Sequence, residues 1–384
     1  MSVLKVKIIK LLSKNDLRKQ CPLKWHENIP PETGISLGVA DVDFEGPEGI
    51  NEYIKSRLDD SFSFYQGQKG MDYAFNSIEN YFDSKSIKVD KNNLQVIPGT
   101  MLGIYAAMKW ASRREGKVIC VGPIYEPIHR HATDNGNPID WVNLENNKFD
   151  IDTLNNSVDN QTKMIAICNP TNPIGYIYSS SDLKGLRDII IDNNLVCFSD
   201  ELYEPLVFNQ PQTSVLSIEG LKERSICLYG FSKAYGLAGY RSGFIHAGDD
   251  LIEEIRGITN SILVSPSPLS SIVCDFALSN EFSKRWVGEF RELMKSNTEI
   301  ASKYFREAGH DCQTPDSCFF VFPDIGVDDA VFVPKLLENK GIQVVEGSHF
   351  GPTGVNHIRV NCATSKERLI EGIDLIITEL RKRN

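Results

Sequence analysis

The chain has 384 residues, of which 41 are Lys or Arg and 51 are Asp or Glu, so its formal net charge is −10 at pH 7. A chain of this length forms one large domain or two, and its acidic balance argues against nucleic-acid binding, which needs a basic surface. No apolar run reaches the ~20 residues that cross a bilayer, so we expect no membrane segment. The nine cysteines are scattered singly without CxxC spacing, which predicts a reduced, cytoplasmic protein without disulfides or a zinc cluster.

Short apolar runs alternate with helical patterns through the middle of the chain. The runs are rich in Val, Ile and Cys without polar alternation, which is typical of strands buried on both faces of a parallel sheet. Strand alternating with helix predicts an α/β layer fold, here with a mostly parallel sheet of seven strands flanked by helices. The predicted strands are 94–97, 118–121, 139–142, 164–168, 195–199, 225–228 and 243–247, with helices such as 101–113 and 180–192 between them.

The last part of the chain has a different pattern. Residues 251–308 are mostly helical and include a helix at 281–308 that is long enough to connect two domains. A smaller α+β unit follows, with strands at 317–322, 342–345 and 357–361 and helices at 330–340 and 366–381. The first 45 residues contain no clear βα unit, and we expect them to pack against this unit. The predicted domains are a large one at 46–280 and a small one made of 1–45 together with 281–384.

The most distinctive local feature is the glycine-rich sequence GFSKAYGLAGYRSG at 230–243, directly after a predicted strand. A lysine at the end of a buried strand is desolvated, which lowers its pKa and makes the neutral amine available for Schiff-base formation. Arg241 follows Lys233 by eight residues on a backbone that glycine allows to approach a ligand closely, as a phosphate clamp requires. The two residues suggest a ligand with a carbonyl group and a phosphate, of which pyridoxal phosphate (PLP) is the commonest.

This sequence resembles the SKxxGLxGxRxG signature of the fold-type I PLP-dependent aminotransferases, the aspartate aminotransferase superfamily. Further matches in the same order cover residues 34–380. The resemblance implies the fold-type I architecture and an enzyme that moves an amino group between an L-amino acid and a 2-oxo acid. Lys233 would be the catalytic residue, joined to PLP as a Schiff base, and Arg241 would bind the cofactor phosphate.

Two further motifs lie at the ends of predicted strands. The sequence SDELY at 199–203 places an acid where α/β sheets bind ligands. The resemblance implies that Asp200 keeps the pyridine nitrogen protonated, so that the ring accepts electron density, and that Tyr203 bonds the cofactor's 3′ oxygen. CNPTNPIG at 168–175 resembles the family's NPxNPTG turn, in which Asn172 would bond the 3′ oxygen and the substrate carboxylate.

The turn PGTM at 98–101 joins a predicted strand to a helix, and the N–H groups at a helix N-terminus bind anions. By resemblance, Gly99, Thr100 and Met101 bind the cofactor phosphate. Tyr125, after the next strand, matches the aromatic residue that stacks on the pyridine ring. Tyr65, in YQGQKG at 65–70, matches a tyrosine that reaches the phosphate of a neighbouring subunit, which implies a homodimer with shared active sites.

The substrate side of the site is indicated near both ends of the chain. FGPTGVNHIRVNCA at 350–363 is similar to the family's FGxxGxxxIRLxxA segment. A buried arginine is costly unless it is paired, and its fork of N–H donors suits bidentate capture of a carboxylate, so Arg359 is the expected clamp for the substrate α-carboxylate. GVADVDF at 38–44 corresponds to the family's GEPDF stretch, which implies a substrate contact at Ala40, where glycine is usual.

Three departures from the family pattern bear on the subfamily. Gly230 stands where relatives commonly carry a Ser or Thr that donates to the phosphate, a contact that Ser232 would replace. GVADVDF also resembles the VADMDF stretch of the cystathionine β-lyase-like branch, and Tyr73 and Ala74 stand where Leu-Arg is typical. Two alternatives to a transaminase therefore stay open: a PLP-dependent C–S β-lyase, and a non-catalytic binding or regulatory module. Aspartate, aromatic and aliphatic donors all stay open as substrates.

A metal site is not expected. His129 and His131 have HxH spacing, but no acidic or Cys partner lies near them in the sequence. We expect both on a solvated helix face.

Overall fold

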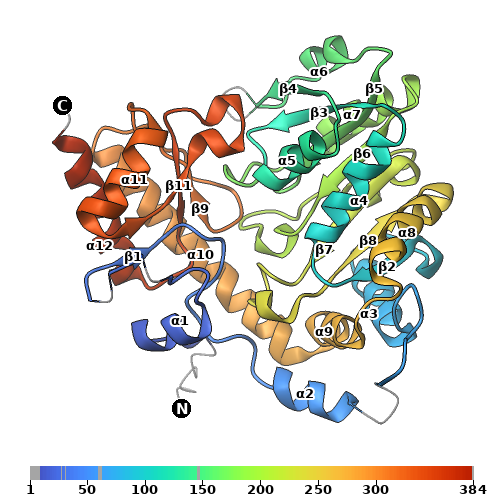
Figure 1. The fold of residues 1–384 in the computed structure, drawn as a ribbon, viewed down its shortest axis with the longest axis horizontal. Helices are drawn as coiled ribbons and strands as arrows, with labels where there is room; N and C mark the ends of the chain where they lie inside the picture. Colours follow the sequence, from blue (N-terminus) through green and yellow to red (C-terminus); the bar gives the residue numbers. More distant parts are fainter. Residues whose placement is uncertain (1–8, 27, 31, 59–62, 145–147, 383–384) are drawn as a thin grey trace.

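Figure 1 shows the computed structural model, which describes every residue except 1–8, 27, 31, 59–62, 145–147 and 383–384. Its largest sheet has seven strands in the order β2-β8-β7-β6-β5-β3-β4. Each predicted strand of the α/β region forms within one or two residues of its expected bounds, which confirms the fold class. The strands are β2 (Leu94–Ile97), β3 (Lys117–Gly122), β4 (Ile139–Asn143), β5 (Thr162–Cys168), β6 (Val196–Asp200), β7 (Ser225–Gly230) and β8 (Gly243–Ala247).

The sheet is mostly parallel, with β8 as the exception. β8 runs antiparallel to both of its neighbours, β2 and β7, so the prediction of a parallel strand at 243–247 is wrong in direction. A parallel neighbour needs a crossover connection, usually a helix, whereas the link from β7 to β8 contains only the 3-10 turn η6 (Ala238–Tyr240). The other six strands share one direction, so their carboxyl ends meet at one edge, next to the start of β8.

Burial differs between the strands of the sheet. β3, β7 and β8 are buried along their whole length, as the unbroken apolar runs predict. β4, at one edge of the sheet, is buried only at Val142, whereas β2 at the opposite edge is buried along its whole length. The prediction of burial on both faces is therefore wrong for β4.

Helices cover the sheet (Figure 1). Helix α7 has the predicted bounds because a capping box at Ser179 and Asp182 fixes its start. Helix α4 packs on α5 and α8 and contacts β3 and β7. The helices around the sheet are α3 (Asp72–Asp83), α4 (Met101–Ser112), α5 (Glu126–Asp134), α6 (Ile151–Ser157), α7 (Ser180–Asp192), α8 (Asp249–Leu263) and α9 (Pro268–Ser279).

Helix α10 (Glu281–Glu307) runs from α9 to α12 (Lys366–Arg381), between the large sheet on the right of Figure 1 and the smaller elements on the left. The smaller elements include α11 (Asp329–Lys340) and an antiparallel sheet in the order β11-β12-β9. Its strands are β9 (Phe320–Val321), β11 (Val345–Glu346) and β12 (Ile358–Asn361). Strand 317–322 is thus shorter than predicted.

The N-terminal segment joins these smaller elements through a second small sheet. β1 (Ile35–Ser36) pairs in parallel with β10 (Ile342–Gln343), so the single strand predicted at 342–345 is divided between two sheets. Ile35 and Leu37 are buried in one cluster with residues of α10, α11 and α12. The short polar helices α1 (Lys14–Gln20) and α2 (Ile50–Arg57) are not predicted by the sequence pattern. The domain boundaries at 46 and 281 stay predictions.

Among the described residues, no helix combines the length and the apolar character that spanning a bilayer would require.

Candidate active site

The ends of several strands bring most of the predicted site residues to one edge of the large sheet. Parallel α/β sheets bind ligands at this edge, because loops that follow neighbouring strands converge there. Gly99 and Thr100 lie between β2 and α4, Tyr125 is the N-cap of α5, Asn172 lies in the turn after β5, Asp200 ends β6, and Lys233 follows β7 by three residues.

The amine of Lys233 lies within this edge and donates a hydrogen bond of 2.6 Å to the carbonyl oxygen of Ala40. Burial lowers the pKa of Lys233 to about 8, and the nearby guanidinium groups of Arg359 and Arg241 add to this effect. Asp41 and Asp200 act in the opposite direction. A lysine with this pKa is neutral in a much larger fraction at neutral pH than an exposed lysine, as a nucleophilic amine requires.

Asp200 is a buried carboxylate that lacks a strong partner. Its side chain accepts a hydrogen bond of 3.2 Å from the N–H of Leu202, and among the described residues it forms no ion pair within 4 Å. Burial raises the pKa of Asp200 to about 7, opposed by the Leu202 N–H and by Lys233. A cationic N–H donor placed against this carboxylate would stabilise its ionised form.

Tyr203 contributes an unsatisfied polar group. Its hydroxyl is buried and has no hydrogen-bond partner among the described residues, and its ring packs 5.6 Å from the rings of both Phe319 and Phe320. Burial raises the pKas of Tyr203 and Tyr125, so both phenols stay protonated. A buried hydroxyl without a partner is costly, and a ligand atom that accepts from it would remove this cost.

The turn before α4 forms an anion-binding corner. Gly99 has a φ of +86°, and a Cβ atom there would lie 2.4 Å from Nη2 of Arg241, so the guanidinium lies directly against the glycine backbone. The first N–H groups of α4, which begins at Met101, have no partner within the helix. A cation and a helix N-terminus at one corner favour a phosphate group.

Gly230 departs from the family pattern for a steric reason. A Cβ atom at Gly230 would lie 2.5 Å from the methyl carbon of Thr100. The Thr100 side chain thus fills the space that a Ser or Thr at position 230 would need. Ser232 is buried two residues further on.

Arg359 is a buried cation without an acidic partner. It is 4% exposed and donates hydrogen bonds to Asn172 Oδ1 (3.1 Å) and to the carbonyl oxygen of Gly38 (2.9 Å). Its guanidinium lies over the rings of Phe320 (4.3 Å) and Phe350 (5.0 Å), and no carboxylate of the described residues lies within 4 Å of it. Burial lowers its pKa. An incoming carboxylate would complete this arrangement.

Tyr65 faces away from the folded chain. Its side chain is 82% exposed, and it lines an open groove of about 600 Å³ with Pro98 and Ser265. Pro98 directly precedes Gly99, so this groove adjoins the anion-binding corner. Tyr65 is therefore available to another chain.

His129 and His131 lie on α5 and are both half-buried, so the expectation of a solvated face is wrong. His129 contacts the carbonyl oxygen of His349 (2.9 Å), and His131 packs against Tyr105. Within the part of the chain that the structure describes, no three His, Cys, Asp or Glu side chains are grouped as a metal site would need.

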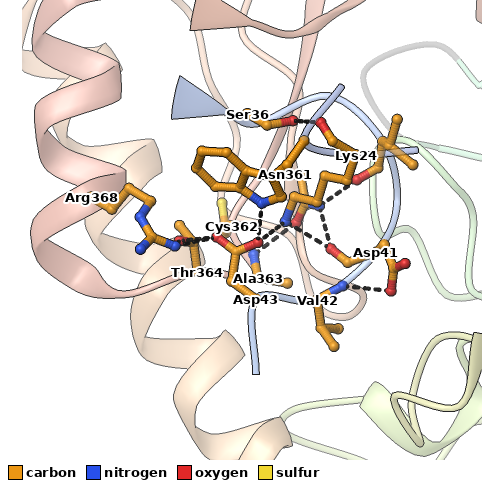
Figure 2. A network of polar contacts seen from close by, with 12 residues as sticks. Lys24, Ser36, Asp41, Val42, Asp43, Asn361, Cys362, Ala363, Thr364 and Arg368 are labelled. Carbon is orange, nitrogen blue, oxygen red and sulfur yellow. Dashed lines mark hydrogen bonds and ion pairs between the residues drawn. The ribbon is translucent and has the colours of Figure 1, made fainter. Parts of the chain in front are cut away.

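Sequence reasoning missed a buried polar network beside the site, drawn in Figure 2. It joins the segment 36–43 to the strand β12 and the start of α12. Asn361 lies two residues after Arg359, and because side chains on a strand alternate, this spacing was the one available signal. Nothing local to Lys24 or Asp43 indicates that they form an ion pair.

The fold is an α/β sheet with a buried lysine and buried carboxylate at its strand ends, and comparison with known proteins identifies the family. The sequence profile of the family "Aminotransferase class I and II" matches residues 32–376. The chain therefore belongs to the class I and II aminotransferases.

The relatives agree with this family. The chain is 28% identical over 360 residues to aromatic-amino-acid aminotransferase 2 of Thermococcus litoralis, covering 91% of this chain and 92% of the relative. It is 29% identical over 365 residues to an aspartate aminotransferase of Pyrococcus abyssi, with the same coverage. The crystal structure of an aromatic aminotransferase from Pyrococcus horikoshii has a TM-score of 0.85 at 26% identity, covering 91% of this chain and 96% of that one.

The protein is thus a PLP-dependent aminotransferase that acts on amino acids and 2-oxo acids. The alternative of a C–S β-lyase receives no support from these relatives, which are named as aminotransferases. The resemblance of GVADVDF to the lyase branch is likewise not supported by them.

Proposed function

We propose that Lys233, Asp200 and Arg359 carry out the transamination, with PLP held among them. The observation that supports this most directly is the amine of Lys233, whose pKa is lowered to about 8 by burial beside Arg359 and Arg241. The polar groups nearby fit the cofactor. The Asp200 carboxylate suits a protonated pyridine nitrogen, the Tyr203 hydroxyl a phenolic oxygen, and the corner at Gly99 a phosphate.

Each end of the cofactor would have its own set of residues. When bound, PLP supplies an electron-withdrawing ring that stabilises negative charge developing on the substrate's Cα. Asp200 would stabilise the proton on the ring nitrogen, and Tyr125 would cover one ring face and exclude water. Asn172 and Tyr203 would hold the 3′ oxygen, and Gly99, Thr100, Met101, Ser232 and Arg241 would bind the phosphate.

Lys233 would also act as the general base. Once its amine is free, burial favours the neutral form, so it can accept the Cα proton of the substrate. A positioned general base typically contributes ~10²–10⁴-fold to the rate. The carbonyl oxygen of Ala40, which accepts from the amine at 2.6 Å, would hold the ammonium that forms.

Arg359 would bind the substrate α-carboxylate, with Asn172 beside it and the backbone at Ala40 lining the other side. Because the relatives are named for aspartate and for aromatic amino acids, we propose an acidic or aromatic L-amino acid as the donor.

A homodimer would complete the site through Tyr65, whose exposed side chain would reach the phosphate corner of the partner subunit. The cytoplasmic location also stays a prediction.

A half-reaction screen tests the proposal. Each of the twenty amino acids is mixed with the PLP-loaded protein, and the change in cofactor absorbance is followed. We expect a fast change with aspartate or an aromatic amino acid, and a KM raised by at least tenfold in Arg359→Lys, because a lysine cannot form the bidentate contact. A native KM in that variant would overturn the role of Arg359.

A further inference from the structure

Four consecutive carbonyl groups at residues 38–41 each accept a hydrogen bond from a side chain. Two of the donors are Arg359 and Lys233, and the other two lie in the network of Figure 2. Gly38 O accepts from Arg359 Nη2 (2.9 Å), Val39 O from Asn361 Nδ2 (2.7 Å), Ala40 O from Lys233 Nζ (2.6 Å), and Asp41 O from Lys24 Nζ (2.9 Å) and Asn361 Nδ2 (2.8 Å).

Asn361 is the central donor of this arrangement. It is fully buried and lies on β12 two residues after Arg359, so both side chains project from the same face of the strand. Its Oδ1 accepts from the N–H of Ala363 at 2.7 Å, and its backbone N–H donates to Leu37 O at 2.7 Å. With the oxygen used by a donor, only the NH₂ group can serve the two carbonyls of Val39 and Asp41.

The far end of the segment is anchored by buried charges. Lys24 and Asp43 form an ion pair of 2.9 Å, and neither side chain is exposed. The Asp43 carboxylate also accepts from Trp25 Nε1 (2.9 Å), Thr364 Oγ1 (2.6 Å) and Arg368 Nη1 (2.6 Å). The segment therefore cannot move without breaking several desolvated contacts, each costly to leave unsatisfied.

We propose that Asn361 is a positioning residue for Arg359 and Lys233. By fixing the carbonyls of Val39 and Asp41, it sets the neighbouring groups: Gly38 O, which precedes Val39 and orients the guanidinium, and Ala40 O, which lies between the two fixed carbonyls and orients the amine. Each Nη of Arg359 carries a second N–H, so a guanidinium held by Gly38 and Asn172 still presents donors to a carboxylate. Pre-orientation reduces the entropy that is lost when a ligand binds. The inference rests on the proposed role of Arg359 as the carboxylate clamp.

Two substitutions of Asn361 separate the effect of its N–H donors from the effect of its packing. Asn361→Ala removes the side chain, whereas Asn361→Asp keeps its size and the acceptor for Ala363 N–H but loses both donors. We expect both variants to raise KM for the preferred amino acid by roughly tenfold, the effect of losing one or two hydrogen bonds, with a smaller change in kcat. The dissociation constants of the PLP-loaded protein for α-methyl-aspartate and α-methyl-phenylalanine, which lack the Cα proton and bind without turnover, should rise by the same factor.

Asn297 supplies a matched control. It lies on α10, is 1% exposed, and its Nδ2 also donates to two backbone carbonyls, those of Cys362 and Thr364, both at 2.9 Å. Asn297→Ala therefore loses two donated bonds of the same kind, while the direct bonds to the carbonyls of residues 38–41 stay in place. We expect it to lower the melting temperature, though less than Asn361→Ala, which also loses the acceptor for the Ala363 N–H, while KM and the dissociation constants stay native.

The outcomes distinguish the two proposals. The inference fails if Arg359→Lys raises KM but the two Asn361 variants bind the α-methyl amino acids with the same dissociation constants as Asn297→Ala. Asn361 would then have a structural role only. If Arg359→Lys has a native KM, the proposed function fails first.

Discussion

The strand-end edge of the large sheet and the segment 38–43 both supply groups to the proposed active site, but they are built by different means. At the strand ends, Asp200 and Lys233 lie within a few residues of a strand, and the sheet itself brings them together. The segment 38–43 has no regular structure to place it. Its carbonyls are held one by one by side chains as distant in sequence as Asn361, and by the buried ion pair of Lys24 and Asp43.

This difference predicts which property a substitution in each region would impair. Substitutions at the strand ends should remove chemistry and leave the fold, because parallel strands do not depend on the residues that follow them. Substitutions around 38–43 should affect stability and ligand affinity together, because the same bonds hold the segment and orient Arg359.

The largest effect is expected for Lys233→Ala. Loss of the amine removes both the covalent link to PLP and the general base, so transamination should fall by more than ~10²–10⁴-fold while the melting temperature stays near native. Borohydride reduction followed by mass spectrometry should find PLP on Lys233 of the native protein. Lys184→Ala, on the exposed face of α7, is the control, and near-native turnover in Lys233→Ala would refute the assignment.

The second effect is a pH dependence of stability after PLP is removed. Burial raises the pKa of Asp200 to about 7, so between pH 4 and pH 7 the folded state binds more protons at this residue than the unfolded state does. The free energy of unfolding should therefore decrease as pH rises through this window, by about 4 kcal/mol for a shift of this size.

Asp200→Asn should remove the decrease in the free energy of unfolding with pH that is due to Asp200. Binding of PLP should do the same, because its protonated nitrogen would stabilise the ionised carboxylate. Denaturant unfolding at several pH values measures both. An identical slope in the native protein and in Asp200→Asn would contradict the prediction.

The third prediction compares two lysines of the N-terminal segment. Lys24→Met removes one partner of a fully buried ion pair, which should lower the free energy of unfolding by about 3 kcal/mol. Lys10 forms a pair of 2.6 Å with Glu45, but its side chain is 70% exposed, so Lys10→Met should leave stability unchanged because solvent screens the pair. Equal effects in the two variants would show that the network of Figure 2 does not anchor the segment.

These two regions also explain how far the sequence could predict the structure. The strands and α7 follow from local patterns: unbroken Val- and Ile-rich runs, and a capping box at Ser179. Most of the residues proposed to bind PLP lie in the turns that follow such strands, and the resemblance of these turns to the family motifs assigned their roles. The direction of β8 could not be predicted, since the periodicity of a strand carries no information about its orientation.

The network around 38–43 escaped prediction for another reason. Asn361 and Lys24 donate to backbone carbonyls. Because every residue has a carbonyl group, the sequence does not indicate which residue accepts these bonds. A sequence pattern also predicts that a lysine is exposed, because most lysines lie on the surface. The burial of Lys24 depends on contacts with Asp43 and with the segment next to β12, which only the fold provides.

The smallest effect is expected at the strand ends, where Gly230 and Thr100 share one space. Gly230→Ser would bring a Cβ atom to 2.5 Å from the Thr100 methyl carbon, and overpacking of this kind should cost about 1 kcal/mol of stability. Thr100→Ser removes the methyl group, so the double variant should regain most of the lost stability. Thermal melts of both single variants and the double variant form a complete cycle. Additive losses would mean that the two side chains do not compete, and that the glycine at 230 has some cause other than the bulk of Thr100.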